Sequence, residues 1–350
     1  MKIAIVSDAW LPQINGVVTT LRKTVEVLRE NGHRVLIVSP EGFKTVPLLT
    51  YPSIRLAVNA RSGVTSALDR FVPDAIHIAT EGPLGYAARR YCLQRQRRFT
   101  TSYHTQFPDY VRLRAPVPIA FTSALLRWFH APAERTMVST ETQREVLRRR
   151  NFGHLAMWER GVDTALFRPR DKSFLCDRRP VFLYAGRVAV EKNIDAFMTI
   201  DVPGTKYVVG DGPDLERLKS EYPEVRFVGL KQGEELAQYM AAADVFVFPS
   251  RTDTFGIVML EAMACGVPVA AYPVTGPIDV VQQGITGILS ENLAGAAVVA
   301  LQLDGHKARQ YALQRTWERA AKQFFCNLAV NATVAEPAPT LTGNPAMVSG

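Results

Sequence analysis

The chain has 350 residues, of which 47% are hydrophobic and 21% charged, and it is longer than one hydrophobic core usually organises, so we expect two domains. This composition excludes a mainly disordered chain. No apolar stretch is long enough to span a bilayer, and we see no secretory signal. The net charge of +8 is concentrated in residues 81–170, where sixteen Arg, no Lys and seven acidic residues give +9.

Two Arg clusters account for much of this charge, and they comprise Arg89, Arg90, Arg95, Arg97 and Arg98, and Arg144, Arg148, Arg149 and Arg150. Such clusters attract anionic lipid or a phosphorylated ligand, or they form a solvated basic surface. Nucleic-acid binding is disfavoured because the clusters lack interleaved aromatic residues and any recognition motif. The four cysteines are far apart without CxxC spacing, which favours reduced thiols in a cytoplasmic protein and no metal site.

Short apolar runs alternate with amphipathic helical patterns along the first half. An apolar run at 2–8, a polar loop, a helical pattern ended by Gly32 and a second apolar run at 33–40 predict a β-α-β unit. The alternation continues with a strand at 74–80, a helix at 82–95, a strand at 98–105 and a helix at 141–151. This succession predicts a parallel sheet with helices on both faces.

The polar stretch from Arg168 to Pro180 carries Pro near both ends and precedes a strong strand, so we place a domain boundary there. The second half repeats the alternation, with strands at 180–186, 205–212, 225–230 and 244–250 and helices at 214–223 and 234–243. A further helix is predicted at 317–328. The remainder is rich in Ala, Pro, Thr and Gly without periodicity, which predicts a disordered tail over 329–350.

The stretch RTDTFGIVMLEAMACG, residues 251–266, predicts a loop followed by a helix that ends at Gly266. The free N–H groups and the positive dipole end of such a helix suit a diphosphate, and Gly256 lets a phosphate approach the backbone. Glu261, one turn into an apolar helix, needs a polar partner such as a ribose diol, and Asp253 would point beyond the phosphates. Alternatively, Asp253 or Thr254 is a simple helix cap and Glu261 belongs to a structural ion pair.

Other candidate residues follow predicted strands. Arg187 and Lys192, five residues apart, can present two cations to a diphosphate leaving group, or they are ordinary surface residues. The VVGDGPD turn lacks the spacing of a dinucleotide-binding loop, which disfavours a nicotinamide cofactor. Gly16, in the loop before the first helix, permits contact with a phosphate or makes a plain turn. His104 ends a strand, where open α/β sheets gather ligands, although a lone His is more often structural.

Seven short motifs, taken in order, resemble those of the family 4 retaining glycosyltransferases over roughly residues 1–326. They are NGV, SYHTQFPDY, RGVDTALFRP, GRVAVEKN, VVGDGP, FVFPSRTDTFGIVMLEAMACGVPV and the Thr-Trp pair at 316–317. The resemblance implies an α/β GT-B fold of two facing, Rossmann-like, doubly wound domains. Residues 1–168 would bind the acceptor, residues 180–315 the nucleotide sugar, and residues 316–328 would form a helix that crosses back to the first domain.

The resemblance also implies a role for each candidate. Arg187 and Lys192 would bind the diphosphate, Glu261 the ribose, and His104 would lie near the donor sugar. Gly16 would belong to a phosphate loop of the first domain. The backbone that supports the sugar and phosphates would come from Phe255, Gly256, Ile257 and Val258.

Asp253 occupies the first acidic position of the family's E-x7-E pattern, one methylene shorter, which leaves its reach to a sugar hydroxyl open. The implied mechanism stabilises the departing diphosphate with fixed cations and amide dipoles, without a metal. The acceptor hydroxyl would attack on the same face while a donor phosphate oxygen takes its proton, so Arg187, Lys192, His104 and Asp253 are the catalytic candidates and no protein nucleophile is assigned.

The expected substrates are a nucleotide sugar and a lipid or glycan acceptor, with no cofactor. The chain resembles bacterial α-mannosyltransferases and glycolipid glycosyltransferases, and this resemblance favours GDP-mannose as the donor. A glycolipid synthase that uses UDP-glucose or UDP-glucuronate is the alternative. A catalytically silent sugar-nucleotide-binding protein is an alternative of another class. An apolar group lies beside Arg112, Arg114 and Arg127, which suits a surface docked peripherally on an anionic membrane. Its members are Leu125, Leu126, Trp128 and Phe129. A buried helix beside the cleft between the domains explains the same pattern.

Overall fold

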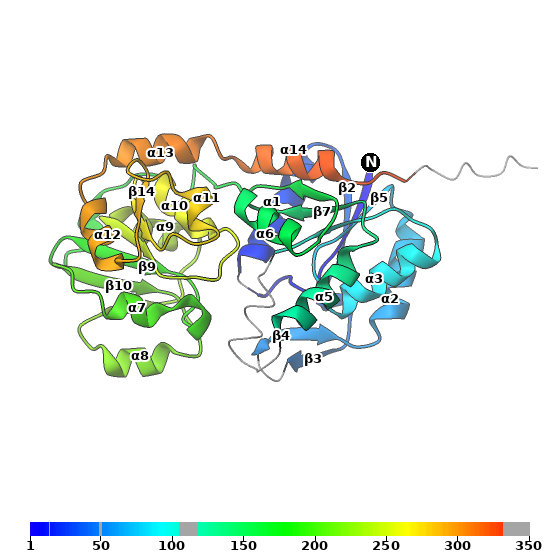
Figure 1. Cartoon of the computed structure of the whole chain (residues 1–350), viewed down its shortest axis with the longest axis horizontal. Coiled ribbons are helices and arrows are strands. Elements are labelled where there is room, and N and C mark those ends of the chain that lie inside the picture. The colour runs from blue at the N-terminus through cyan, green and yellow to red at the C-terminus, as the bar shows by residue number, and fades with distance from the viewer. Residues whose placement is uncertain (14, 49–50, 105–117, 332–350) are drawn as a thin grey trace, which may run out of the picture.

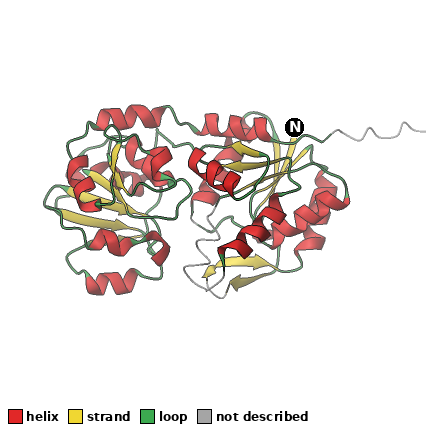
Figure 2. Ribbon diagram, viewed as in Figure 1, coloured by secondary structure: helices red, strands yellow, loops and turns green. Residues whose placement is uncertain are grey.

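The computed structural model describes residues 1–13, 15–48, 51–104 and 118–331. The described chain forms two α/β units, each built on a six-stranded sheet (Figures 1 and 2). All pairings within these two sheets are parallel, as the alternation of strands and helices predicts. The residues of SYHTQFPDY after His104, together with Arg112, Arg114 and the tail from 332, lie outside the described residues.

The first unit has the strand order β2-β1-β5-β6-β7-β8. Its strands are β1 (Lys2–Val6), β2 (Arg34–Val38), β5 (Ala75–Ile78), β6 (Thr100–Ser102), β7 (Arg135–Val138) and β8 (Leu155–Met157), with a separate hairpin of β3 (Thr45–Leu48) and β4 (Tyr51–Ala57). Its helices are η1 (Pro40–Gly42), α1 (Gly16–Glu30), α2 (Ala60–Phe71), α3 (Pro83–Gln94), α5 (Ile119–His130) and α6 (Glu141–Arg149).

The second unit has the strand order β11-β10-β9-β12-β13-β14. Its strands are β9 (Val181–Ala185), β10 (Thr205–Val209), β11 (Arg226–Gly229), β12 (Val245–Phe248), β13 (Val269–Ala271) and β14 (Gly287–Leu289). Its helices are η2 (Lys172–Phe174), η3 (Val190–Lys192), α7 (Ile194–Met198), α8 (Leu215–Glu221), α9 (Gly233–Ala242), α10 (Ile257–Ala264), α11 (Pro277–Val280), α12 (Leu293–Ala300) and α13 (Gly305–Leu313).

Each sheet is covered on both faces, so each unit has two layers of apolar core. In the second sheet, alternate residues of β9 point to opposite sides: Leu183 packs with α9 and α10, whereas Phe182 and Tyr184 pack with α7 and α12. The strand order reverses direction beside β1 in the first sheet and beside β9 in the second. Open α/β sheets bind their ligands at the carboxyl ends of the strands at such a reversal.

A helix returns the chain from the second unit to the first. The helix α13 lies over the second unit, and the next helix, α14 (Trp317–Asn327), packs against α1 of the first (Figure 1). Phe324 joins the core of the first sheet. At the crossing, Gly161 passes so close that a Cβ there would lie 2.5 Å from the Trp317 nitrogen. The predicted crossover helix is therefore present.

The chain after α14 continues along the first unit. Ala329 is buried, Val330 forms an antiparallel bridge with Ala75, and the Asn331 side chain accepts a hydrogen bond from the Arg98 nitrogen. The prediction of disorder from residue 329 is thus wrong for residues 329–331, because backbone pairing and burial hold them.

The polar segment between the two units is anchored to the second. Phe167 and Leu175 are buried in its core, and Arg170 forms an ion pair with Glu234 of α9. The domain limits expected at residues 168 and 180 remain a prediction, but the residues between them pack on the second sheet.

Candidate functional site

The carboxyl edges of the two sheets meet at the loop after β12. The Thr254 hydroxyl donates to the His104 carbonyl oxygen at 2.7 Å, across the two units. In return, the Ser139 and Thr140 hydroxyls donate to the Thr254 carbonyl oxygen at 3.2 and 3.3 Å. A Cβ on Gly16, the first residue of α1, would lie 3.6 Å from the Ile257 side chain at the start of α10. The structure thus brings the predicted first-domain residues to the start of α10.

The helix α10 begins at a glycine that offers no side-chain cap. Its cap residue is Gly256, in the left-handed conformation at φ 80°, and among the described residues no side-chain cap is present. A Cβ at Gly256 would lie 2.7 Å from the Met259 methyl group and 2.9 Å from the Phe248 ring, so close packing requires glycine. Thr254 donates its hydroxyl to the His104 carbonyl and Asp253 pairs with Lys192, so the contacts of the described residues do not support the alternative that either side chain caps this helix.

The other backbone candidates flank this helix start. The Phe255 ring is buried in the second core, while Ile257 and Val258 are partly buried against it. Their side chains therefore fix the position of the helix, which leaves the backbone as the part that can face a ligand.

Glu261 is half-buried on α10, one turn beyond its start. Burial raises the pKa of its carboxyl to about 7. Among the described residues, none donates a hydrogen bond to this carboxylate or forms an ion pair with it. The alternative of a structural ion pair is therefore not supported within the described chain, and a ligand hydroxyl would find an acceptor here.

Lys192 and Asp253 lie together. The Lys192 ammonium is 2.6 Å from a carboxylate oxygen of Asp253, and the two side chains are 20% and 17% exposed. Their loops are joined further by hydrogen bonds from Thr252 to the Glu191 carbonyl and from Asn193 to the Pro249 carbonyl. Lys192 therefore reaches the loop that precedes α10, where a diphosphate is expected.

Arg187 lies two residues after the end of β9, at the carboxyl edge. The Tyr184 hydroxyl donates to the Arg187 carbonyl oxygen at 2.7 Å and fixes the turn. Burial lowers the pKa of the Arg187 guanidinium, and nearby Glu191 and Asp211 partly offset this effect. The VVGDG turn packs against the same loop, since a Cβ on Gly210 would lie 1.8 Å from the Gly186 oxygen. Close backbone packing thus explains that glycine.

His104 is buried, and both its ring nitrogens are occupied. The Arg160 guanidinium lies 3.1 Å from Nδ1, and the Ser102 hydroxyl lies 2.9 Å from Nε2 and also 2.9 Å from the His77 ring. Because Arg can only donate, Nδ1 is the acceptor and Nε2 carries the proton. Burial, followed by the charge of Arg160, lowers the pKa of His104 well below its usual value. The imidazole of His104 is therefore neutral and fixed, while the backbone carbonyl of His104 faces the second unit.

Two site residues have contacts that the sequence does not indicate. The sequence suggests Thr254 only as a helix cap, and no pattern shows that its hydroxyl crosses to the first unit. Arg160 belongs to the RGVDTALFRP stretch, but its contact with His104 joins residues 56 positions apart. Its burial also lowers the pKa of its guanidinium to about 9.

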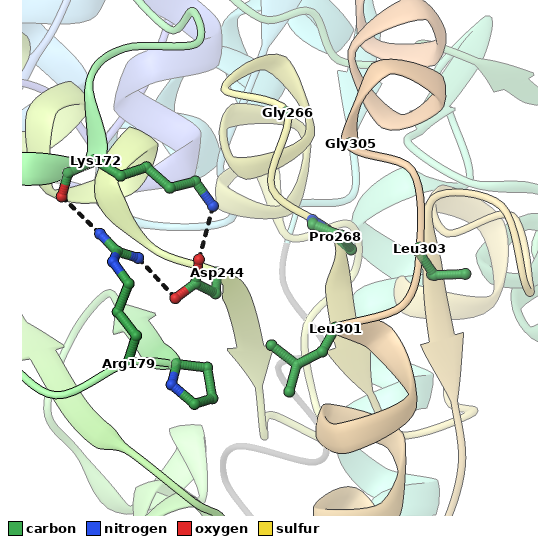
Figure 3. Close-up of a pocket in the computed structure, with 9 residues that line it drawn as sticks. Lys172, Arg179, Asp244, Gly266, Pro268, Leu301, Leu303 and Gly305 are labelled. Carbon is green, nitrogen blue, oxygen red and sulfur yellow. Dashed lines mark hydrogen bonds and ion pairs between the residues drawn. The ribbon is translucent and has the colours of Figure 1, made fainter.

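A shallow depression of about 570 Å³ lies on the opposite edge of the second sheet (Figure 3). Asp244 and Pro268, which line it, directly precede β12 and β13. The Asp244 carboxylate pairs with Lys172 at 2.8 Å and Arg179 at 2.7 Å, as the dashed lines show. These ion pairs anchor the connecting segment to the second sheet. Because the depression lies at the edge opposite the carboxyl ends of the strands, it is separate from the site.

Comparison with known proteins gives matches along both units. A family model described as "Glycosyltransferase Family 4" matches residues 14–166, and one described as "Glycosyl transferases group 1" matches residues 179–303. The GDP-mannose-dependent alpha-mannosyltransferase of Mycolicibacterium smegmatis is 32% identical over 91% of this chain and 94% of its own length. The chain belongs to the family 4 glycosyltransferases. The expected family and glycosyltransferase activity are therefore confirmed.

Other similar proteins agree with this family 4 assignment. The GDP-mannose-dependent alpha-mannosyltransferase of Mycobacterium tuberculosis is 32% identical, with 83% of each chain covered. The structure of sucrose-phosphate synthase from Thermosynechococcus elongatus matches with a TM-score of 0.75 at 24% identity, over 93% of this chain and 97% of that one. This structural likeness confirms the expected GT-B fold.

The roles of individual residues in this glycosyltransferase remain predictions. Within the described ranges, no three His, Cys, Asp or Glu side chains gather to hold a metal ion, and the expected absence of a metal also stays a prediction. In the same ranges, no helix is long and apolar enough to cross a membrane.

Proposed function

We propose that this protein transfers mannose from GDP-mannose to a hydroxyl group of a lipid or glycan acceptor, with retention of configuration. The observation that carries the proposal is the meeting of Lys192, the uncapped start of α10 and the half-buried Glu261 carboxylate at one sheet edge. Together they supply groups for a diphosphate and a ribose. The names of the mycobacterial relatives support GDP-mannose as the donor.

The reaction places growing negative charge on the departing diphosphate. Lys192, Arg187 and the N–H groups at the start of α10 would stabilise that charge, which is larger in the transition state than in the ground state. When the diphosphate binds, it competes with Asp253 for Lys192, and the Asp253 carboxylate becomes available to a sugar hydroxyl. In this way the shorter acidic side chain would still serve the donor.

A screen of GDP- and UDP-sugars tests the donor and the activity together. Thermal unfolding with each nucleotide reports binding, and release of GDP or UDP reports turnover. GDP release from GDP-mannose supports the proposal. Nucleotide binding without release from any sugar nucleotide would instead support a catalytically silent binding protein.

Other relatives support a UDP-sugar as an alternative donor. The alpha-monoglucosyldiacylglycerol synthase of Streptococcus pneumoniae is 26% identical over 93% of this chain and 83% of its own length. Its name supports a glycolipid synthase, the alternative for which we expect UDP-glucose or UDP-glucuronate as the donor. UDP release in the same screen, without GDP release, would favour that alternative.

The helix α5 carries an exposed apolar stripe that suits a lipid surface. Phe121, Leu125 and Trp128, spaced by four and three residues, are 66%, 40% and 52% exposed. The Arg89 guanidinium lies 3.9 Å over the Trp128 ring and places positive charge beside the stripe. We propose that this stripe docks on an anionic membrane, which brings the site to a lipid acceptor.

Part of the earlier membrane hypothesis is corrected by the structure. Leu126 and Phe129 are buried in the first domain, so they cannot contact lipid, whereas Phe121 faces outward. Flotation with anionic vesicles at low salt tests the docking, and Phe121→Ser with Trp128→Ser should leave the protein in the soluble fraction. Val299→Ser, an exposed apolar position of α12, is the control. Wild-type protein that does not float would contradict the docking.

A further inference from the structure

A glutamate at the carboxyl edge of the first sheet has no role in the site described so far. Glu81 lies in the loop between β5 and α3. The strand β5 pairs in parallel with β6, with Ile78 opposite Thr101, and β6 leads to His104. Both loops therefore leave the same sheet edge, where the second domain docks on the His104 carbonyl.

The loop that carries Glu81 is held firmly on both sides. The Asp8 carboxylate accepts from the Thr80 hydroxyl and from the Leu84 nitrogen, both at 2.9 Å. A Cβ on Gly82 would lie 2.3 Å from the Asp8 carboxyl carbon, so only glycine fits beside that carboxylate. Glu81 is thus placed between fixed neighbours.

The Glu81 side chain is supported by a chain of buried hydrogen bonds. One carboxylate oxygen lies 3.2 Å from Nε2 of His130, whose Nδ1 lies 2.8 Å from the Thr101 hydroxyl. That hydroxyl lies 3.0 Å from the Thr136 hydroxyl. An ionised carboxylate only accepts, so Nε2 of His130 donates to it. The His130 ring is itself held by Thr101, so the Glu81 carboxylate rests on a buried, hydrogen-bonded support.

The second carboxylate oxygen is left for a ligand. The Glu81 side chain is 23% exposed, and within the described residues the only hydrogen bond to it comes from His130. On the basis of the glycosyltransferase activity proposed above, we propose that Glu81 is an acceptor-binding residue whose second oxygen accepts a hydrogen bond from an acceptor hydroxyl. It would orient that hydroxyl at the edge where the two domains meet.

The surroundings favour an acceptor that is polar at one end and apolar at the other. The charge of Glu81 contributes to raising the pKa of the Tyr86 hydroxyl, behind the larger effect of burial, so the two groups lie close. The Tyr86 ring stacks on Trp128, with centroids 6.0 Å apart. Glu81 therefore lies at the polar end of a surface that continues into the apolar stripe of α5.

The variant Glu81→Gln tests this role without removing the support. The Gln carbonyl oxygen can still accept from His130, whereas the second oxygen becomes an amide donor. The probe is α-glucosyl dioctanoylglycerol in mixed micelles, and its binding to nucleotide-saturated protein and its use as acceptor are both measured. Glu134→Gln is the control, because Glu134 is also a carboxylate but pairs with Arg98 at the opposite end of the sheet.

We expect Glu81→Gln to weaken probe binding and raise the acceptor KM about 10- to 100-fold, as for a hydrogen bond to a charged group. The nucleotide affinity and the rate of donor hydrolysis should stay within about twofold of wild type, and the unfolding temperature within about 1 °C. These limits are roughly the scatter of a neutral surface change. Unchanged probe affinity in Glu81→Gln, or a wild type that binds nucleotide but not the probe, would overturn the role of Glu81. Failure of wild type to bind any nucleotide would instead overturn the proposed function.

Discussion

The Glu261→Gln variant should be more stable than the wild-type protein and should bind nucleotide less tightly. Glu261 is half-buried on α10 among apolar neighbours, and no described residue donates to its carboxylate. Its ionised form is therefore costly in the free protein, although a ribose diol would stabilise it. Glutamine has the same shape and no charge.

The size of the effect follows from the pKa. Burial raises the pKa of Glu261 from 4.5 to about 7. The folded protein therefore holds a proton that the unfolded chain has lost, and stability falls as pH rises from 4.5 to 7. At about 1.36 kcal/mol for each pKa unit, this loss amounts to about 3 kcal/mol at pH 8. The variant should be more stable than wild type by about that amount at pH 8.

Denaturant unfolding at pH 5 to 8.5 measures the difference between the two proteins. The difference in unfolding free energy between the two proteins cancels the contributions of all other titrating groups. The control is Glu216→Gln, because the Glu216 side chain on α8 is 85% exposed. Nucleotide binding at pH 8, where Glu261 is ionised, should weaken in Glu261→Gln, because its amide replaces the charged acceptor. A pH-independent difference, or a variant less stable than wild type at pH 8, would refute the reasoning.

Three further predictions address other parts of the site. Arg187→Ala and Lys192→Ala should each lower kcat about 10²-fold in a nucleotide-release assay, and wild-type turnover in both would exclude them from the mechanism. Thr254→Val removes a buried cross-domain hydrogen bond and leaves the His104 oxygen without its donor, so unfolding should show a loss of about 1–3 kcal/mol. The imidazole NMR signals of His104 should not shift between pH 5.5 and 8, because its pKa is well below 6.5, and a midpoint near 6.5 would contradict the buried network.

The fold was largely predictable because its signals are local. Strand-length apolar runs and amphipathic helical patterns alternate along the chain, and right-handed crossovers leave few ways to arrange them. The segment 329–331 shows the limit. Its Ala, Val and Asn carry no periodic signal, yet Val330 pairs with Ala75 on the first sheet. Such pairing depends on a surface that exists only after the chain has folded.

The site was predictable as a set of positions but not as a set of partners. A residue that follows a predicted strand must lie at the carboxyl edge, which locates Arg187 and His104. Their contacts are made with distant parts of the chain, and spacing gives no information on them. Arg160 is the clearest case, because its guanidinium is buried beside His104 without any local pattern to indicate it.

The contacts of Thr254 and Asp253 also explain why, within the described residues, the start of α10 has no side-chain cap. Thr and Asp commonly cap helices, and both precede this one, so a capped helix was a reasonable alternative. In the folded protein, Thr254 donates to the His104 carbonyl of the other domain, and Asp253 pairs with Lys192. Gly256, at the cap position itself, has no side chain to offer. A contact between the domains occupies Thr254 and an ion pair within the second domain engages Asp253, so the N–H groups of α10 stay available to an anion.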